Sequence, residues 1–363
     1  MKAFFRELIS QSPKKMISFA DFINDALYHP EMGYYMKNNV KIGKSGDFIT
    51  SSNISSVFGM MFARWYVEFA KKNMLSPAIC EIGAGNGRFA KAFLEEWKKS
   101  TDESISYFIV EASPFHRSLQ KELLKPYFEV NQLNSLEELI DFEGMVFSNE
   151  LFDALPVHVI EKENGSLKEV MVGVSEGELA ETKVPLTNSE ILLFLNESKL
   201  SLTEGQRIEI PLAMEKMVCT IATRLKKGIV MSIDYGYTNE EWSNPSRRKG
   251  SLRGYREHQL VDNVLENPGE MDITSHIHFD WLIDRGEKYG LQPVFKLKQD
   301  EFLLKAGILK ELEEHFDPNP FSETSKRNRA IRSLIMPSGM SSSFDILLQQ
   351  KGMNASLENC FNT

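Results

Sequence analysis

Three glycines at every second position follow a short apolar run near residue 80. Residues 78–82 are predicted to form a buried strand that carries Glu81 near its end, and Gly83, Gly85 and Gly87 lead from it into a predicted helix. A turn without side chains lets a ligand lie against the main chain, and α/β proteins bind ligands at the carboxyl ends of their strands. The pattern therefore favours a small-molecule site here over a tight strand–helix turn that binds nothing.

A second acid ends the next apolar run. Residues 107–111 are predicted to form a strand whose last residue, Glu111, would lie beside the glycine turn and could accept hydrogen bonds from ribose hydroxyls. A dinucleotide site would have a third glycine where this chain has Arg88, which disfavours a nicotinamide-dependent dehydrogenase. The alternation of glycines after an acid-bearing strand instead resembles motif I of class I methyltransferases, which bind S-adenosylmethionine (SAM).

Two more acids follow the third predicted strand. Asn149, Glu150 and Asp153 come directly after residues 145–148, so their loop is expected at the same sheet edge as the glycine turn. Paired carboxylates there could hold a guanidinium group in line with a methyl donor. A solvated turn, with Asp153 as a helix N-cap, is the alternative.

The elements that must position these residues alternate between strand and helix. The alternation predicts an α/β protein with a parallel, doubly wound sheet. Further strands are expected at residues 228–234, 292–298 and 344–349, and helices at residues 54–73, 87–98, 113–125, 212–227, 279–289 and 301–316. Asn164-Gly165 predicts a β-hairpin turn, and residues 237–276 and the Pro-, Ser- and Gly-containing stretch before residue 344 are expected to be irregular.

Several stretches, in order along most of the chain, together resemble the MidA-type methyltransferase family, whose mitochondrial members are complex I assembly factors and protein arginine methyltransferases. These stretches are His29–Tyr35, Gly46–Ser51, the glycine turn, Val110–Pro114, Ser148–Pro156, Ile233–Tyr237, Gly250–Tyr255 with His258, and Pro268–His276. The chain departs from the family pattern at His278, where the family commonly has aspartate, and at Ser52, Asn53 and Met60.

The resemblance implies a class I methyltransferase (Rossmann-like) fold with a seven-stranded sheet. It implies an N-terminal helical and loop cap at residues 1–55 and a methyltransferase domain at residues 56–363, with an inserted β-hairpin region at about residues 156–208. SAM is the implied cofactor. The implied cofactor-binding residues are Asp47, Thr50, Glu81, Gly83, Gly85, Gly87, Glu111, Ser113 and Asn149, and the catalytic candidates are Glu150 and Asp153.

The leading functional hypothesis is SAM-dependent methylation of a protein acceptor, with arginine as the candidate side chain. A small-molecule methyltransferase and a SAM-binding assembly factor or chaperone with little catalysis are the alternatives. His258, His276 and His278 have no third partner at metal-ligand spacing, so we predict no metal site. Tyr255 could touch the substrate or tie its loop to the protein.

Composition restricts the protein class. The formal net charge of −9 argues against nucleic acid as a partner, and no run of about 18 apolar residues predicts a membrane-spanning helix. The three cysteines show no CxxC spacing, so neither a disulfide framework nor a zinc ribbon is expected. This cysteine content indicates a reducing compartment, and we predict that the protein is cytoplasmic.

Overall fold

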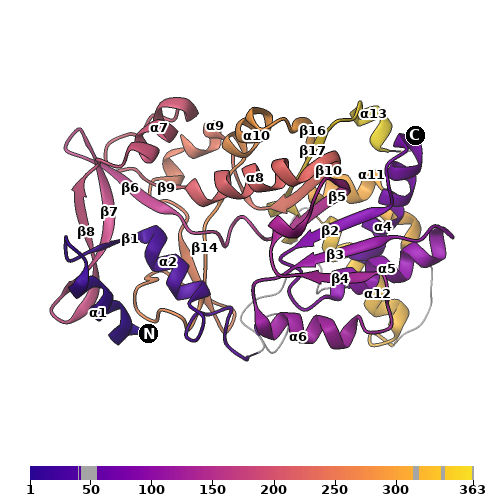
Figure 1. Ribbon diagram of the computed structural model, residues 1–363, viewed down its shortest axis with the longest axis horizontal. Coiled ribbons are helices and arrows are strands. Elements are labelled where there is room, and N and C mark those ends of the chain that lie inside the picture. The colour runs from indigo at the N-terminus through magenta and orange to yellow at the C-terminus, as the bar shows by residue number, and fades with distance from the viewer. Residues whose placement is uncertain (40, 42–54, 314–318, 337–339, 362–363) are drawn as a thin grey trace.

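The computed structural model describes residues 1–39, 41, 55–313, 319–336 and 340–361. Two lobes lie side by side (Figure 1). The sheet lobe contains a seven-stranded sheet and its helices, and the chain ends there. The second lobe contains the N-terminus, a five-stranded sheet and a smaller three-stranded sheet.

The central sheet confirms the predicted α/β class and the number of strands. In spatial order its strands are β16 (Gln292–Lys298), β17 (Asp345–Lys351), β10 (Leu225–Asp234), β5 (Phe142–Asn149), β2 (Ala78–Ile82), β3 (Ser106–Val110) and β4 (Val130–Leu133). The prediction of a wholly parallel sheet is wrong, because β17 runs antiparallel to both β10 and β16. Since β17 is the strand that follows β16 in the chain, it can return beside β16 without a crossover.

Alternation along the strands divides the sheet lobe into two cores. Ile79 of β2 packs on one face with α4 (Ser56–Asn73) and α5 (Arg88–Ser100). Its neighbour Cys80 packs on the other face with α8 (Leu212–Arg224) and α10 (Phe279–Lys288). Helices therefore cover both faces, and only the strand ends are left to form a site.

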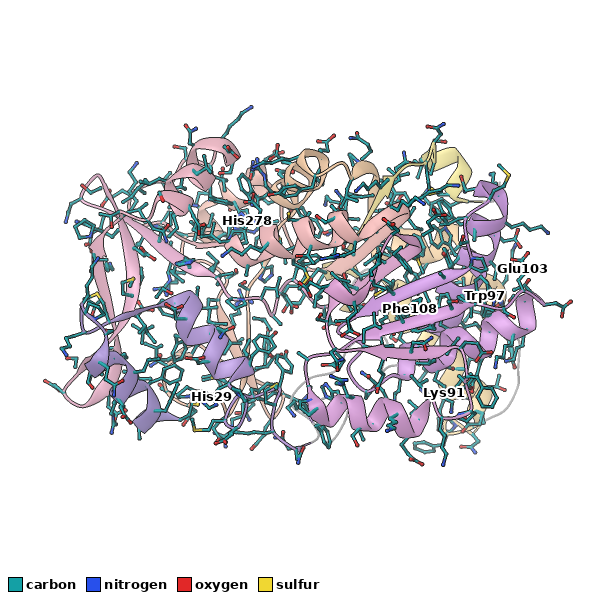
Figure 2. The ribbon with its side chains drawn as sticks, viewed as in Figure 1. His29, Lys91, Trp97, Glu103, Phe108 and His278 are labelled. Atoms are coloured by element: carbon teal, nitrogen blue, oxygen red, sulfur yellow. The ribbon has the colours of Figure 1, made fainter. Side chains whose placement is uncertain are left out.

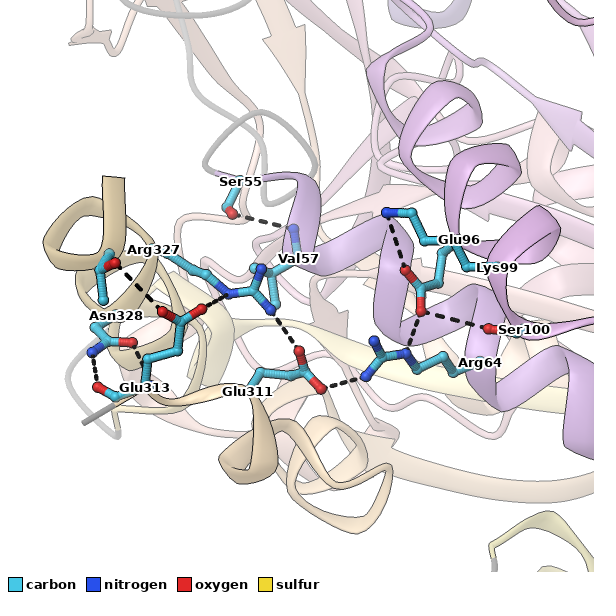
Figure 3. Close-up of polar contacts among 11 residues, drawn as sticks. Ser55, Val57, Arg64, Glu96, Lys99, Ser100, Glu311, Glu313, Arg327 and Asn328 are labelled. Atoms are coloured by element: carbon cyan, nitrogen blue, oxygen red, sulfur yellow. Dashed lines mark hydrogen bonds and ion pairs between the residues drawn. The ribbon is translucent and has the colours of Figure 1, made fainter. Parts of the chain in front are cut away.

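A polar network joins helices that are distant in sequence (Figure 3). Arg64 of α4 pairs with Glu96 of α5 at 2.5 Å and with Glu311 of η3 (Ile308–Glu311). Arg327 of α12 (Glu323–Ile335) reaches the other oxygen of Glu311 at 2.5 Å. These contacts hold α12 near α4, where the sequence had predicted an irregular stretch.

The second lobe is built around a five-stranded sheet, which α1 (Lys2–Gln11) and α2 (Phe19–Tyr28) cover (Figure 1). Its strands are β1 (Ile17–Ser18), β6 (His158–Glu163), β7 (Ser166–Ser175), β8 (Glu178–Pro185) and β9 (Arg207–Ile210). Ser18 and Asp21 form a capping box at the start of α2. This box fixes the entry of the helix that carries Tyr28 toward the sheet lobe.

Short strands lie within and beside residues 237–276, which the sequence predicts to be irregular. They are β11 (Gly236–Tyr237), β12 (Arg253–Arg256), β13 (Gln259–Val261), β14 (Asp272–Thr274) and, directly after the stretch, β15 (Ile277–His278). Strands of two to four residues leave too little alternation in a sequence to be recognised. The remaining elements are α6 (Pro114–Leu123), η1 (Leu136–Glu138), α7 (Ser189–Ser198), α9 (Asn239–Trp242), η2 (Pro245–Arg247), α11 (Gln299–Lys305), η4 (Met340–Ser343) and α13 (Leu357–Cys360).

Candidate active site

A cavity of about 610 Å³ is lined by residues from both lobes. The sheet lobe contributes the glycine turn after β2, Glu111 after β3 and the loop after β5. The second lobe contributes Tyr28, Tyr35, Tyr255 and Asp272. The volume is within the roughly 300–1,000 Å³ of small-molecule sites, and it lies at the carboxyl edge of the sheet, where the sequence predicted it.

All three glycines of the turn adopt backbone conformations that favour glycine. Their φ angles are 73° at Gly83, 53° at Gly85 and 78° at Gly87. Gly83 and Gly85 line the cavity, whereas Gly87 is not among its lining residues and instead caps α5. A Cβ on Gly87 would lie 3.1 Å from Cγ of Gln120, so packing explains that glycine without a ligand.

Glu111 is bound to the turn that it faces. Its Oε2 accepts a hydrogen bond from the Gly85 amide at 2.9 Å, and its Oε1 accepts one from the Ser113 amide at 2.8 Å. Burial raises the pKa of Glu111 to about 7, while these two amides act in the opposite direction. The Ala112 amide also interacts with this carboxyl. A carboxylate has about four lone-pair sites, so one remains for a ligand hydroxyl.

Glu81 and Ser113 lie on either side of this region. Glu81 lines the cavity and its Oε2 accepts a hydrogen bond from the Tyr107 hydroxyl at 2.6 Å. Burial raises the pKa of Glu81 to about 8, which keeps the group largely protonated near neutral pH. Ser113 is fully buried and does not line the cavity; its hydroxyl caps α6 and donates to the Tyr35 carbonyl at 2.6 Å.

The loop after β5 places Asn149, Glu150 and Asp153 on the cavity. Glu150 has a φ of 54°, a left-handed conformation that is uncommon for a residue with a Cβ. Its amide donates to the Ile233 carbonyl at 2.9 Å, and Asn149 Nδ2 donates to Glu150 Oε1 at 3.0 Å. The strained backbone is therefore fixed by β10, and it directs attention to Glu150 as a functional side chain.

Two residues at the end of β10 hold this acid loop, and we had not singled out either as a site residue. Asp234 is fully buried and accepts hydrogen bonds from the amides of Phe152 at 2.9 Å and Asp153 at 3.3 Å. The Tyr235 hydroxyl donates to Asp153 Oδ2 at 2.5 Å. Burial raises the pKa of Asp153 to about 6, and burial beside Asp153 raises that of Asp234 well above its usual range.

The opposite wall is aromatic and carries a further acid. Tyr28 and Tyr35 stack with ring centroids 5.5 Å apart, and the Tyr35 hydroxyl donates to Asp272 Oδ1 at 2.7 Å. The Tyr28 hydroxyl donates to the Ala154 carbonyl at 3.0 Å, which joins this wall to the acid loop. Neither Tyr28 nor Tyr235 is among the predicted site residues, although Tyr235 lies in the family stretch Ile233–Tyr237.

Three of the remaining predicted residues are not among the described residues that line the cavity. Asp47 and Thr50 are outside the described residues. His278 is buried beside α7 (Figure 2), where its ring stacks on Trp242 at 4.6 Å and its Nε2 meets the Glu209 carbonyl at 2.8 Å. Across the ranges that the structure describes, no group of three His, Cys, Asp or Glu side chains could hold a metal ion. Within the same ranges no helix has the length and apolar character needed to cross a bilayer.

Comparison with protein families identifies the family of this chain. A family model described as "Putative S-adenosyl-L-methionine-dependent methyltransferase" matches residues 61–295, well over half of the chain. The chain belongs to this MidA-type methyltransferase family. SAM is the cofactor of the family, and the strand–turn–helix with Gly83 and Gly85 lies inside the matched range.

Curated relatives of this methyltransferase share about a quarter of its residues. A Drosophila melanogaster protein named "Protein arginine methyltransferase NDUFAF7 homolog, mitochondrial" is 29% identical over 75% of this chain and 66% of its own length. The Danio rerio protein of that type is 25% identical over 95% of this chain and 85% of its own length. These names make the prediction of a cytoplasmic location wrong. Unpaired cysteines indicate only a reducing environment, which is not specific to the cytoplasm.

Solved structures agree with the family. A Burkholderia thailandensis protein bound to S-adenosyl-homocysteine is 28% identical to this methyltransferase, with a TM-score of 0.90 over 99% of this chain and 93% of that one. A native structure from the same organism is also 28% identical and has a TM-score of 0.87. The similarity covers nearly the whole chain, so both lobes belong to the shared architecture.

Proposed function

We propose that this methyltransferase transfers the methyl group of SAM to a protein acceptor, with the guanidinium group of arginine as the side chain that receives it. The observation that carries the proposal is the pair of acids, Glu150 and Asp153, on the same cavity as the glycine turn. The names of the curated relatives support the choice of acceptor at 24–29% identity.

The residues of the sheet lobe fit the cofactor. Gly83 and Gly85 offer main chain without side chains, and Glu111 keeps a lone-pair site for a ribose hydroxyl. We assign Glu81 and Asn149 to the same half of the cavity, and Gly87 and Ser113 to the support of the turn and of α6. Asp47 and Thr50 remain part of the proposal. When bound, SAM supplies an electrophilic methyl group on a sulfonium.

The acid loop would orient the acceptor. A guanidinium is a poor nucleophile because its lone pairs are delocalised and its pKa exceeds about 12. A carboxylate that holds two of its N–H groups fixes the remaining nitrogen in one direction, and proximity of this kind can lower a barrier by roughly 7–11 kcal/mol. Glu150 is half-buried and faces the cavity, whereas Asp153 is nearly buried and bound to Tyr235. We therefore assign direct contact to Glu150 and the shaping of its pocket to Asp153.

The N-terminal part of the chain closes this site in the proposal. Tyr28 and Tyr35 line the cavity from residues 1–55, the proposed cap, while the domain at residues 56–363 carries the turn and the acid loop. The inserted region at about residues 156–208 supplies β6–β8, on which the helices of the cap pack.

The test uses SAM with a labelled methyl group and two acceptor fractions from one lysate, desalted proteins and the protein-free extract. Label in the protein fraction, located on arginine by mass spectrometry and lost with Glu150→Gln, is the expected result. Label in the protein-free extract alone would make the protein a small-molecule methyltransferase. SAM binding without transfer to either fraction would favour a binding protein with little catalysis.

A further inference from the structure

The turn between β12 and β13 has a backbone that its residues do not favour. Arg256 pairs with Gln259, so Glu257 and His258 are the two central residues of a two-residue hairpin turn. Their φ angles are 51° and 61°. Such turns favour Asn-Gly or Asp-Gly, because both positions need positive φ.

The same chain uses glycine at the equivalent position of two other hairpin turns. The β6–β7 turn is Asn164-Gly165 and the β7–β8 turn is Glu176-Gly177. A Cβ on Gly165 or Gly177 would meet no atom within 4 Å, so glycine is used there for its backbone freedom rather than for lack of space. His258 therefore carries a side chain at the second central position of its hairpin turn, where the other two turns have glycine.

The location of His258 can explain why the turn has a side chain at this position. His258 and Tyr255 line the cavity, whereas Gly165 and Gly177 do not. Tyr255 pairs directly with Leu260, so the two side chains project from the same face of the hairpin, and Leu260 is 53% exposed. The other face is anchored, because Gly254 packs against Met271 of the buried core.

We propose that His258, together with Tyr255 and Leu260, binds the acceptor polypeptide at the mouth of the cavity; this inference rests on the proposed function. An imidazole can hydrogen-bond to a polypeptide main chain, and Tyr255 with Leu260 offers an apolar contact beside it. The hairpin belongs to the second lobe and pairs with β14, whereas the glycine turn belongs to the sheet lobe, so we assign the hairpin to the acceptor rather than to SAM.

Two glycine substitutions separate binding from backbone strain. Glu257→Gly and His258→Gly each remove one Cβ from a positive φ, and each should leave the melting temperature unchanged or raise it by about 1–2 °C. His258→Gly should raise the KM for desalted lysate proteins by roughly 3- to 10-fold, the effect of losing one hydrogen bond with its contacts. Glu257→Gly is the matched control and should retain the wild-type KM. Leu260→Ser should also raise the KM.

The affinity for SAM, measured by calorimetry, should be unchanged in both glycine variants. A wild-type KM in His258→Gly, an equal rise in Glu257→Gly, or weakened SAM binding in His258→Gly would overturn this assignment while the proposed function stands. If the wild-type protein transfers no label to any protein, the proposed function fails and this inference fails with it.

Discussion

The acids of the cavity are held in two different ways. Glu111, on the proposed cofactor half, accepts hydrogen bonds from two amides of neighbouring loops, Gly85 and Ser113. Asp153, on the proposed acceptor half, depends on Tyr235, which is 82 residues away in the chain. Glu111 is thus held by contacts between consecutive strand–helix units of the chain, whereas Asp153 is held by a contact across a much longer stretch of chain.

This difference suggests how substitutions elsewhere in the chain affect the two halves of the cavity. A turn that is fixed by its own glycines and by the next strand keeps its shape when distant residues change. An acid loop that is fixed by Asp234 and Tyr235 responds to the end of β10. We therefore expect changes at the end of β10 to affect the proposed acceptor half more than the glycine turn.

The largest expected effect is loss of cofactor binding on Gly85→Val. A branched side chain at a φ of 53° would occupy the space beside the turn and strain the backbone. Calorimetric titration with SAM should show no detectable binding. Gly165→Val is the matched control, because it places the same side chain at a φ of 74° in a turn away from the cavity. That control should lose stability and keep SAM binding; equal affinities in both variants would remove the turn from the site.

The second effect tests the acceptor half. Glu150→Gln keeps the shape of the side chain and removes its charge, so methyl transfer should fall about 100-fold, close to 3 kcal/mol in barrier height. The dissociation constant for SAM should change little, because Glu150 is assigned to the acceptor. Glu143→Gln is the control and should transfer normally, because Glu143 lies in β5 before the acid loop and pairs with the surface residue Lys226. A large loss of SAM affinity in Glu150→Gln would instead make this residue a cofactor ligand.

The comparison also explains what could be predicted from the sequence. β2 was predicted with its observed bounds, and the glycine turn and Glu111 were placed at one sheet edge, because these features are local. The positioning roles of Asp234 and Tyr235 were not predicted. Their contacts with the acid loop depend on β10 lying beside β5, which no spacing in the sequence specifies.

Helix α12 illustrates a second cause of error. It buries Ser325, Asn328, Ile331 and Leu334, which have helical spacing, but half of them are polar and the apolar signal is weak. Asn328 is accommodated because its amide donates to the Glu313 carbonyl at 2.7 Å. The burial of a polar side chain such as Asn328 can be predicted only when its hydrogen-bond partner is known.

A third prediction measures how the cofactor half binds its ligand. Glu111→Gln should weaken SAM binding by about 1–2 kcal/mol, roughly tenfold, because an NH2 donor replaces one of the two oxygens that accept hydrogen bonds. Calorimetry at neutral pH is the measurement. Methyl transfer at saturating SAM should stay within about threefold of the wild-type rate. A loss of transfer without a loss of affinity would contradict the division of the cavity into two halves.

The smallest expected effect concerns Glu81, whose carboxyl is buried against Tyr107. Burial raises its pKa from the ordinary 4.5 to about 8, so the folded protein holds a proton that the unfolded chain releases above pH 4.5. The wild type should therefore lose stability as pH rises from about 4.5 to 8, and Glu81→Gln, which cannot ionise, should lose less. The linkage slope is about 1.4 kcal/mol per pH unit between the unfolded and folded pKa values. Relaxation around a buried carboxyl lowers its folded pKa and narrows the pH range over which this slope applies, so we expect a difference of at least about 1 kcal/mol to develop between pH 5 and pH 8.

Urea unfolding without SAM at pH 5, 6, 7 and 8 measures this difference. Tyr107→Phe sharpens the test, because removing the hydroxyl that donates to Glu81 should raise the pKa of this carboxyl further and extend the loss of stability to higher pH. SAM affinity of Glu81→Gln at neutral pH should remain close to that of the wild type, since the protonated carboxyl and the amide both lack charge. A constant difference in unfolding free energy at every pH would mean that Glu81 is ionised in the folded protein, and its partner Tyr107 would then act as a charge-stabilising donor.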